Sequence, residues 1–159
     1  SDAALTILAS HAPLLELGAG TGYWASLLKQ RSVDIVAFDE KHFHLSFNSQ
    51  TDISEGQEIS SKYFCDVKQG GPESVGQYED RTLLLMWPDY MGFGAYGLQC
   101  LQHYKGQKLI LIGEWKNSTF GSYSKGVSEH GQSFSLEFQN KVEEEFQLVE
   151  SVDLPNWPL

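Results

Sequence analysis

The feature that most constrains this fold is a short apolar run that passes directly into three alternating glycines. Residues 14–28 read LLELGAGTGYWASLL, with glycines at Gly18, Gly20 and Gly22. Glycine adopts the left-handed backbone conformations that sharp turns need, and its missing side chain lets a ligand approach the main chain. The following helix presents unpaired backbone N–H groups, which favour a polar or anionic ligand group. The run predicts a strand, a turn and a helix that hold a nucleotide-like cofactor.

Apolar runs and helical periodicity alternate along the rest of the chain. The pattern predicts strands at 33–38, 62–67, 82–87, 108–112 and 147–154, and helices at 2–10, 23–30, 91–104 and 133–146. A short helix is expected to begin at Pro72. Residues 41–61 are predicted as a long, partly ordered segment and residues 113–131 as a loop. Such alternation is typical of a single α/β domain, here residues 1–159, with a mostly parallel sheet and helices on both faces.

The composition limits which partners the protein is expected to bind and in which cellular compartment it is expected. The chain has 159 residues and a net charge of −10 without any run of Lys or Arg, which disfavours nucleic acid and anionic membranes. The chain has no stretch of about 18 apolar residues, so no membrane span is predicted. Cys65 and Cys100 lie far apart in apolar stretches, so we expect free thiols in an intracellular, cytoplasmic setting. Ser1 is compatible with a cleavage site, so the earlier removal of an organelle-targeting segment stays open.

The spacing of the glycines distinguishes between cofactors. A dinucleotide-binding turn places its third glycine one residue later, and the Gly-Lys-Ser/Thr end of a phosphate-binding loop is missing. The pattern found here, with Glu16 at the end of the strand, resembles motif I of the class I S-adenosylmethionine-dependent methyltransferases. The resemblance implies a three-layer, Rossmann-like methyltransferase fold that binds S-adenosyl-L-methionine and releases S-adenosyl-L-homocysteine. The family sheet usually ends in a seventh, antiparallel strand, and we expect most or all of this strand to be missing here. An unpaired sheet edge would favour an oligomer or a partner there.

The resemblance also implies a set of cofactor-binding residues. Asp39, at the tip of the second strand, is expected to accept hydrogen bonds from both ribose hydroxyls, with Glu40 as the alternative. Asp66 and the backbone of Val67 are expected at the adenine ring, with Gln69 as the alternative to Asp66. The cofactor-binding set comprises Glu16, Gly18, Ala19, Gly20, Gly22, Tyr23, Asp39, Asp66, Val67 and Trp87.

The substrate is expected at the ends of the fourth and fifth strands. Residues 86–90 read MWPDY, which is similar to the Asp/Asn-Pro-Pro-Tyr motif of methyltransferases that act on planar amino groups, but Trp87 occupies the position of the polar acceptor. The catalytic set predicted here is Asp89 as a base, Tyr90 as an aromatic wall and Glu114 as a second acid on the same rim. Core packing is the alternative for Trp87, and a solvated loop acid is the alternative for Glu114.

Two functions remain open at this stage. The first is a methyltransferase acting on a protein or small-molecule acceptor, because the acidic composition disfavours RNA and DNA. The second is a non-catalytic, methyltransferase-like subunit that binds the cofactor or a partner in an assembly or regulatory role. A nicotinamide-dependent oxidoreductase is disfavoured by the glycine spacing, and His42 and His44 lack the further ligands that a metal site needs.

Overall fold

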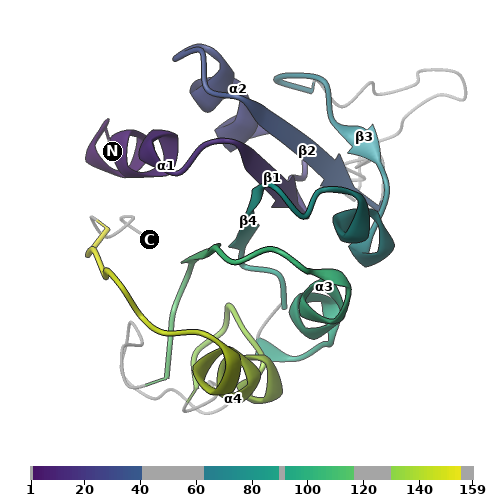
Figure 1. Cartoon of the computed structure of the whole chain (residues 1–159), viewed down its shortest axis with the longest axis vertical. Coiled ribbons are helices and arrows are strands. Elements are labelled where there is room, and N and C mark those ends of the chain that lie inside the picture. The colour runs from purple at the N-terminus through teal and green to yellow at the C-terminus, as the bar shows by residue number, and fades with distance from the viewer. Residues whose placement is uncertain (1, 41–62, 90–91, 117–129, 155–159) are drawn as a thin grey trace, which may run out of the picture.

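A five-stranded parallel sheet lies between two layers of helices in the computed structural model, which describes residues 2–40, 63–89, 92–116 and 130–154 (Figure 1). The strands are β1 (Leu14–Leu17), β2 (Ile35–Asp39), β3 (Lys68–Gln69), β4 (Thr82–Met86) and β5 (Leu109–Ile112). The helices are α1 (Asp2–Ser10), α2 (Tyr23–Lys29), the 3-10 helix η1 (Pro72–Gln77), α3 (Tyr96–His103) and α4 (Leu136–Glu145). The α/β prediction is confirmed.

The order of the strands places β1 at the centre of the sheet. The order is β3-β2-β1-β4-β5, so β1 pairs with β2 on one side and with β4 on the other. The chain therefore builds outward from β1 in one direction and then reverses at β4. In open parallel sheets of this Rossmann-like kind, ligands bind outside the carboxyl ends of the strands at such a reversal.

The two faces of the sheet bury separate apolar layers. Leu15 and Leu17 of β1 pack with η1, α3 and α4, whereas Leu14 packs with α1 and α2. This alternation follows from the two-residue period of a strand, and a strand covered on both faces is apolar throughout. Leu84 and Leu85 of β4 are fully buried, one in each layer, and each contributes about 1.5–3 kcal/mol of burial free energy.

The third strand begins later than expected. The sequence predicts a strand at 62–67, but the described residues of this range form none, and β3 follows them. Two contacts explain the difference. The N–H of Phe64 donates to the carbonyl of Thr21 at 2.9 Å, and Val67 packs closely against Gly22. This segment therefore packs against the end of the glycine turn, at Thr21 and Gly22, instead of joining the sheet.

The predicted sixth strand at 147–154 is wrong. After α4 the chain is extended, but no ladder forms, and Leu148 and Val149 are 79% and 93% exposed. The segment runs from α4 toward the side of the molecule where α1 lies, and Leu154 packs against the α1 and α2 layer (Figure 1). An extended segment becomes a strand only when its backbone groups find a neighbouring strand, and none is described beside this one.

The third helix is shorter than its predicted range, 91–104. Gly92 and Gly94 have φ values of 71° and 134°, which a right-handed helix excludes, and α3 begins only after them.

Both Cys65 and Cys100 are free thiols, as expected. Within the described ranges, no helix combines the length and the apolar character of a membrane span.

Candidate functional site

The glycine turn between β1 and α2 lies at the point where the strand order reverses. Gly18, Gly20 and Gly22 all have positive φ values, of 73°, 56° and 75°. Residues with a side chain rarely adopt this conformation, so the turn requires glycine three times. Gly22 has a second reason to be glycine, since an added Cβ would lie 2.6 Å from Cγ2 of Val67 and 2.9 Å from Sγ of Cys65.

The backbone at Gly20 is open, in contrast to that at Gly22. A Cβ added to Gly20 would meet no atom of the described residues within 4 Å. The turn is nevertheless fixed in place, because the N–H of Gly20 donates to Oδ2 of Asp39 at 2.8 Å and the N–H of Ala19 donates to the carbonyl of Phe38 at 3.0 Å. The result is a fixed main-chain loop with an uncovered surface, which suits close contact with a ligand.

Asp39 links the turn to the end of β2, where the ribose-binding carboxylate was expected. Its bond to Gly20 does not preclude a ligand, because a carboxylate has about four acceptor sites. The end of β3 continues this arrangement, since the N–H of Gly70 donates to the carbonyl of Asp39 at 3.0 Å. A Cβ added to Gly71 would lie 2.7 Å from Oε1 of Glu40 and 2.9 Å from Oε2 of Glu73. Three carboxylates therefore lie near the ends of β2 and β3.

Glu16 lies inside the protein, directly below the turn. Its side chain is 2% exposed and points to the α2 side of the sheet, where the backbone N–H of Ala25 bonds its carboxyl group. Burial raises the pKa of Glu16 to about 8, with a smaller contribution from Asp39 and an opposing one from Lys29. Oε2 of this carboxyl group has no hydrogen-bond partner among the residues that the structure describes.

Tyr96, which the sequence analysis missed, lies on the opposite side of the turn. Its ring is 3.6 Å from the position that a Cβ on Gly18 would occupy. Burial raises the pKa of the Tyr96 hydroxyl far above its usual value, and Cys100, Glu40 and Asp39 raise it further. No sequence signal distinguished this tyrosine from core aromatics, because it begins an ordinary amphipathic helix.

The expected adenine-binding residues occupy a different place in the fold. Asp66 precedes β3, so the reason for assigning it to the adenine, that it follows the third strand, is wrong. Its carbonyl accepts a hydrogen bond from Nζ of Lys29 at 3.3 Å, and Val67 packs on Gly22. Gln69, the alternative, is the last residue of β3 and is exposed. Asp66 and Val67 therefore lie beside the turn on the α2 side, whereas Gln69 lies nearer to Asp39.

Two expected aromatic residues are exposed near the turn. Tyr23 begins α2, is 45% exposed and contacts Phe64 edge-on at 5.3 Å between ring centroids. Trp87 follows β4 with a φ of 46° and is 47% exposed, which excludes the alternative of core packing. A left-handed conformation costs a non-glycine residue of order 1–3 kcal/mol and is most often retained at functional positions. Tyr90 lies outside the described residues.

Asp89, by contrast, is a buried structural carboxylate. It is 1% exposed, Oδ1 accepts the N–H of Gly97 at 3.2 Å, and Oδ2 accepts the N–H of Ser135 at 2.9 Å. Gly97 lies in the first turn of α3, and Ser135 is the N-cap of α4. Asp89 therefore joins the beginnings of two helices, and these contacts leave it no exposed position from which to act as a base.

Glu114 has a related role at the end of β5. Its Oε2 accepts the N–H of Gln132 at 2.8 Å, while its own N–H donates to Oγ of Ser133 at 2.8 Å. Gln139, fully buried, accepts from the N–H of Lys116 at 2.8 Å and donates to the carbonyl of Phe134 at 3.0 Å. Together these groups dock the segment before α4 onto the ends of β4 and β5. The predicted reaction rim is thus largely occupied by the protein itself.

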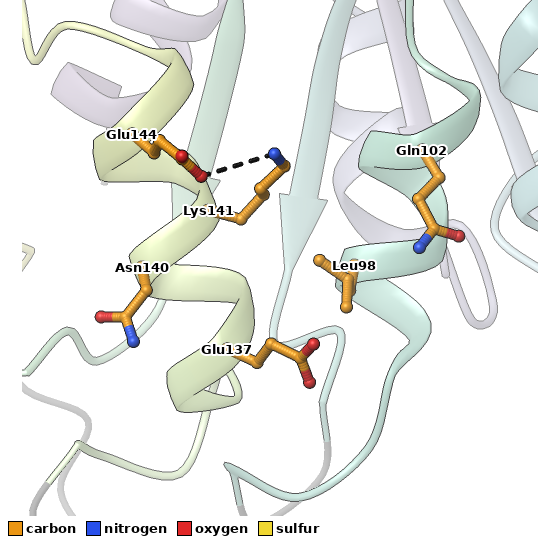
Figure 2. A pocket seen from close by; sticks show the side chains of 6 residues that line it. All are labelled: Leu98, Gln102, Glu137, Asn140, Lys141 and Glu144. Carbon is orange, nitrogen blue, oxygen red and sulfur yellow. Dashed lines mark hydrogen bonds and ion pairs between the residues drawn. The ribbon is translucent and has the colours of Figure 1, made fainter.

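A groove of about 480 Å³ lies elsewhere, between α3 and α4. Figure 2 shows Leu98 and Gln102 projecting from α3 toward four polar side chains of α4, where Lys141 and Glu144 form an ion pair of 3.4 Å. None of its lining residues belongs to the predicted site. The candidate site is therefore the glycine turn with Glu16, Asp39, Trp87 and Tyr96.

The residues of this site are suited to a ligand with hydroxyl groups and a positive charge. Asp39, Glu40 and Glu73 are acceptors, and their negative charge repels phosphate and attracts cations. Comparison with known protein families, curated proteins and solved structures found no match to this chain.

Proposed function

We propose that the chain binds S-adenosyl-L-methionine at the carboxyl end of β1 and transfers its methyl group to a protein or small-molecule acceptor. The observation that carries this proposal is the glycine turn: three left-handed glycines at the reversal of the strand order, with open space above Gly20 and with Asp39 bonded to the turn. This combination supplies close main-chain contact and a ribose-binding carboxylate in one place.

The charge of the site favours this ligand over a dinucleotide. Asp39 accepts the N–H of Gly20, and the carboxylates of Glu40 and Glu73 both lie beside Gly71, so three negative charges lie near the ends of β2 and β3. A pyrophosphate would be repelled there, whereas the sulfonium and ammonium groups of S-adenosyl-L-methionine would be attracted. Electrostatics and glycine spacing therefore disfavour the same alternative for independent reasons.

The roles assigned to the chain's own residues are those of binding and positioning. The turn from Gly18 to Gly22 would hold the ligand against the main chain, and Asp39 would accept from the ribose. The bound ligand supplies an already activated methyl group, so transfer depends chiefly on holding the acceptor in line. Trp87, exposed and held in a left-handed conformation beside β4, would form a wall of the acceptor site.

A second candidate function follows from the contacts of the two expected catalytic acids. Asp89 and Glu114 each bind backbone N–H groups of the segment before α4. A domain whose rim acids are used in this way fits a non-catalytic subunit that binds the same ligand or a partner in an assembly or regulatory role. Where this subunit binds the ligand, it differs from the first candidate only in methyl transfer.

Isothermal titration calorimetry tests the binding of this ligand. Wild-type protein is titrated with S-adenosyl-L-methionine, S-adenosyl-L-homocysteine and NAD, and only the first two are expected to bind. Asp39→Asn is expected to weaken binding by about 1.5–3 kcal/mol, the usual loss for a charge-assisted hydrogen bond. Asp80→Asn, at an exposed acid in the turn before β4, is the matched control and should bind normally.

A methyl-release assay across protein and small-molecule acceptors then separates the two candidates. Turnover by the wild type that is lost in Asp39→Asn supports the methyltransferase function. Tight binding of S-adenosyl-L-homocysteine without turnover on any acceptor supports the non-catalytic subunit. Binding of NAD in place of S-adenosyl-L-methionine would refute both.

A further inference from the structure

The two unsatisfied polar side chains in the described part of the chain both flank the glycine turn. They are Oε2 of Glu16 and the hydroxyl of Tyr96, each closed off from solvent and without a hydrogen-bond partner. A buried polar group without a partner destabilises a protein by about 1–3 kcal/mol. Such groups are therefore uncommon and need a physical explanation, and here both lie beside the glycine turn.

A second tyrosine on the same helix shows the usual arrangement. Tyr104 follows the last residue of α3, and its hydroxyl contacts four backbone groups. It lies 2.9 Å from the carbonyl of Arg81 and bonds the carbonyl of Lys108, and it accepts from the N–H groups of Lys108 and Leu83 at 3.2 and 3.4 Å. Tyr96, at the first residue of α3, has none of these. The helix therefore presents one satisfied phenol at its far end and one unsatisfied phenol next to Gly18.

The neighbours of the Tyr96 hydroxyl define what it would bind. Its ring lies beside Gly18, in the turn whose Gly20 N–H donates to Asp39. Burial and then Cys100 are the main causes of the raised pKa of this hydroxyl, followed by Glu40 and Asp39 at the end of β2 and Glu73 in η1. A phenol donates a hydrogen bond and a carboxylate accepts one, so a ligand hydroxyl between them can accept from the first and donate to the second. Glu40 is exposed, so its side chain can move as a ligand enters without disturbing the core.

We propose that the hydroxyl of Tyr96 donates a hydrogen bond to a ribose hydroxyl of the ligand, whose own proton is accepted by a carboxylate at the end of β2. The proposal rests on the proposed function, and it assigns to α3 one half of a site whose other half is β2. Tyr96 thereby becomes a specificity-determining residue that favours a sugar with intact hydroxyls over a deoxy sugar.

The test compares Tyr96→Phe with Tyr104→Phe, which removes a hydroxyl from the same helix. Calorimetry measures the affinity for S-adenosyl-L-homocysteine. Competition experiments measure the affinities for adenosine, 2′-deoxyadenosine and 3′-deoxyadenosine. Tyr96→Phe is expected to bind S-adenosyl-L-homocysteine about tenfold more weakly, with little further loss for one of the two deoxy compounds. Tyr104→Phe is expected to bind all four as the wild type does.

Thermal unfolding of the ligand-free variants supplies a readout that is independent of binding. Tyr96→Phe is expected to melt at or above the wild-type temperature, because no hydrogen bond is lost, whereas Tyr104→Phe should melt lower. A lower melting temperature for Tyr96→Phe would show that its hydroxyl already has a partner and would overturn the proposal. Equal binding by wild type and Tyr96→Phe would overturn it while leaving the proposed function intact, and absence of wild-type binding would overturn both.

Discussion

Replacing Glu16 with glutamine should make the protein more stable at neutral and alkaline pH. Glu16 is 2% exposed and one of its oxygens has no partner, so its ionised form is strongly disfavoured in the folded state. Glutamine has nearly the same shape and no charge. The substitution therefore removes a single titration from the interior and leaves the apolar packing of the α2 side unchanged.

The size and direction of the effect follow from the raised pKa. In the unfolded chain this carboxyl loses its proton near its ordinary value of 4.5, whereas in the folded protein it holds the proton up to about 8. Between these values the folded state binds more protons than the unfolded state, so wild-type stability falls as pH rises, by at most about 1.4 kcal/mol per pH unit. The stability gained by Glu16→Gln should grow across this window to a total on the order of 3–5 kcal/mol.

Urea unfolding at pH values from 4.5 to 8.5 measures this difference. Titrations common to wild type and variant cancel in the difference curve, which leaves the contribution of Glu16. Glu79→Gln, at an exposed position in the turn before β4, is the control and should give a flat difference curve. A flat curve for Glu16→Gln, or one that falls as pH rises, would refute the assignment of a buried, protonated Glu16.

Three further predictions concern the stability of the free protein, measured by urea unfolding at constant pH. Gly20→Ala should cost about 1–2 kcal/mol for its left-handed backbone, and Gly22→Ala should cost more, since its added Cβ would also clash with Val67 at 2.6 Å; equal costs would contradict this. Asp89→Asn should cost about 2 kcal/mol, because one of two buried backbone N–H groups loses its acceptor, and a loss below 0.5 kcal/mol would argue against its bridging role. Trp87→Gly should be about 1 kcal/mol more stable than Trp87→Ala, since only glycine adopts a φ of 46° without strain, and the reverse order would contradict that strain.

The central strand and the glycine turn were predictable because their causes are local. The apolar run before Gly18 could only be a buried strand, and the alternate glycines required a turn whatever surrounded them. The position of Asp39 beside the turn was predictable indirectly, because parallel strands end at the same edge of a sheet. The structure adds what no local pattern contains, namely the bond between Asp39 and Gly20 and the burial of Glu16 below the turn.

The errors in the prediction arise where distant segments compete for the same surface. Val67 has the apolar character of a strand residue, but its side chain fits against Gly22, so β3 begins after it. Asp89 and Glu114 follow strands as catalytic acids often do, yet the segment before α4 folds back across the rim and uses both as acceptors. Its position depends on Gln139, whose buried amide gave no signal in the sequence.

The prediction of a sixth strand was wrong for a related reason. Residues 147–154 have suitable strand-forming side chains, but strand formation depends on a neighbour that the sequence cannot locate. Tyr96 escaped notice because its significance lies in an unmet hydrogen bond, which only three-dimensional structure reveals.

Titration of the purified protein with S-adenosyl-L-methionine by calorimetry tests the central claim most directly. We expect saturable binding at one site per chain, weakened by about tenfold or more in Asp39→Asn and unaffected in Asp80→Asn. Absence of binding, or binding that Asp39→Asn leaves unchanged, would contradict the assignment of the glycine turn and Asp39 as the ligand site.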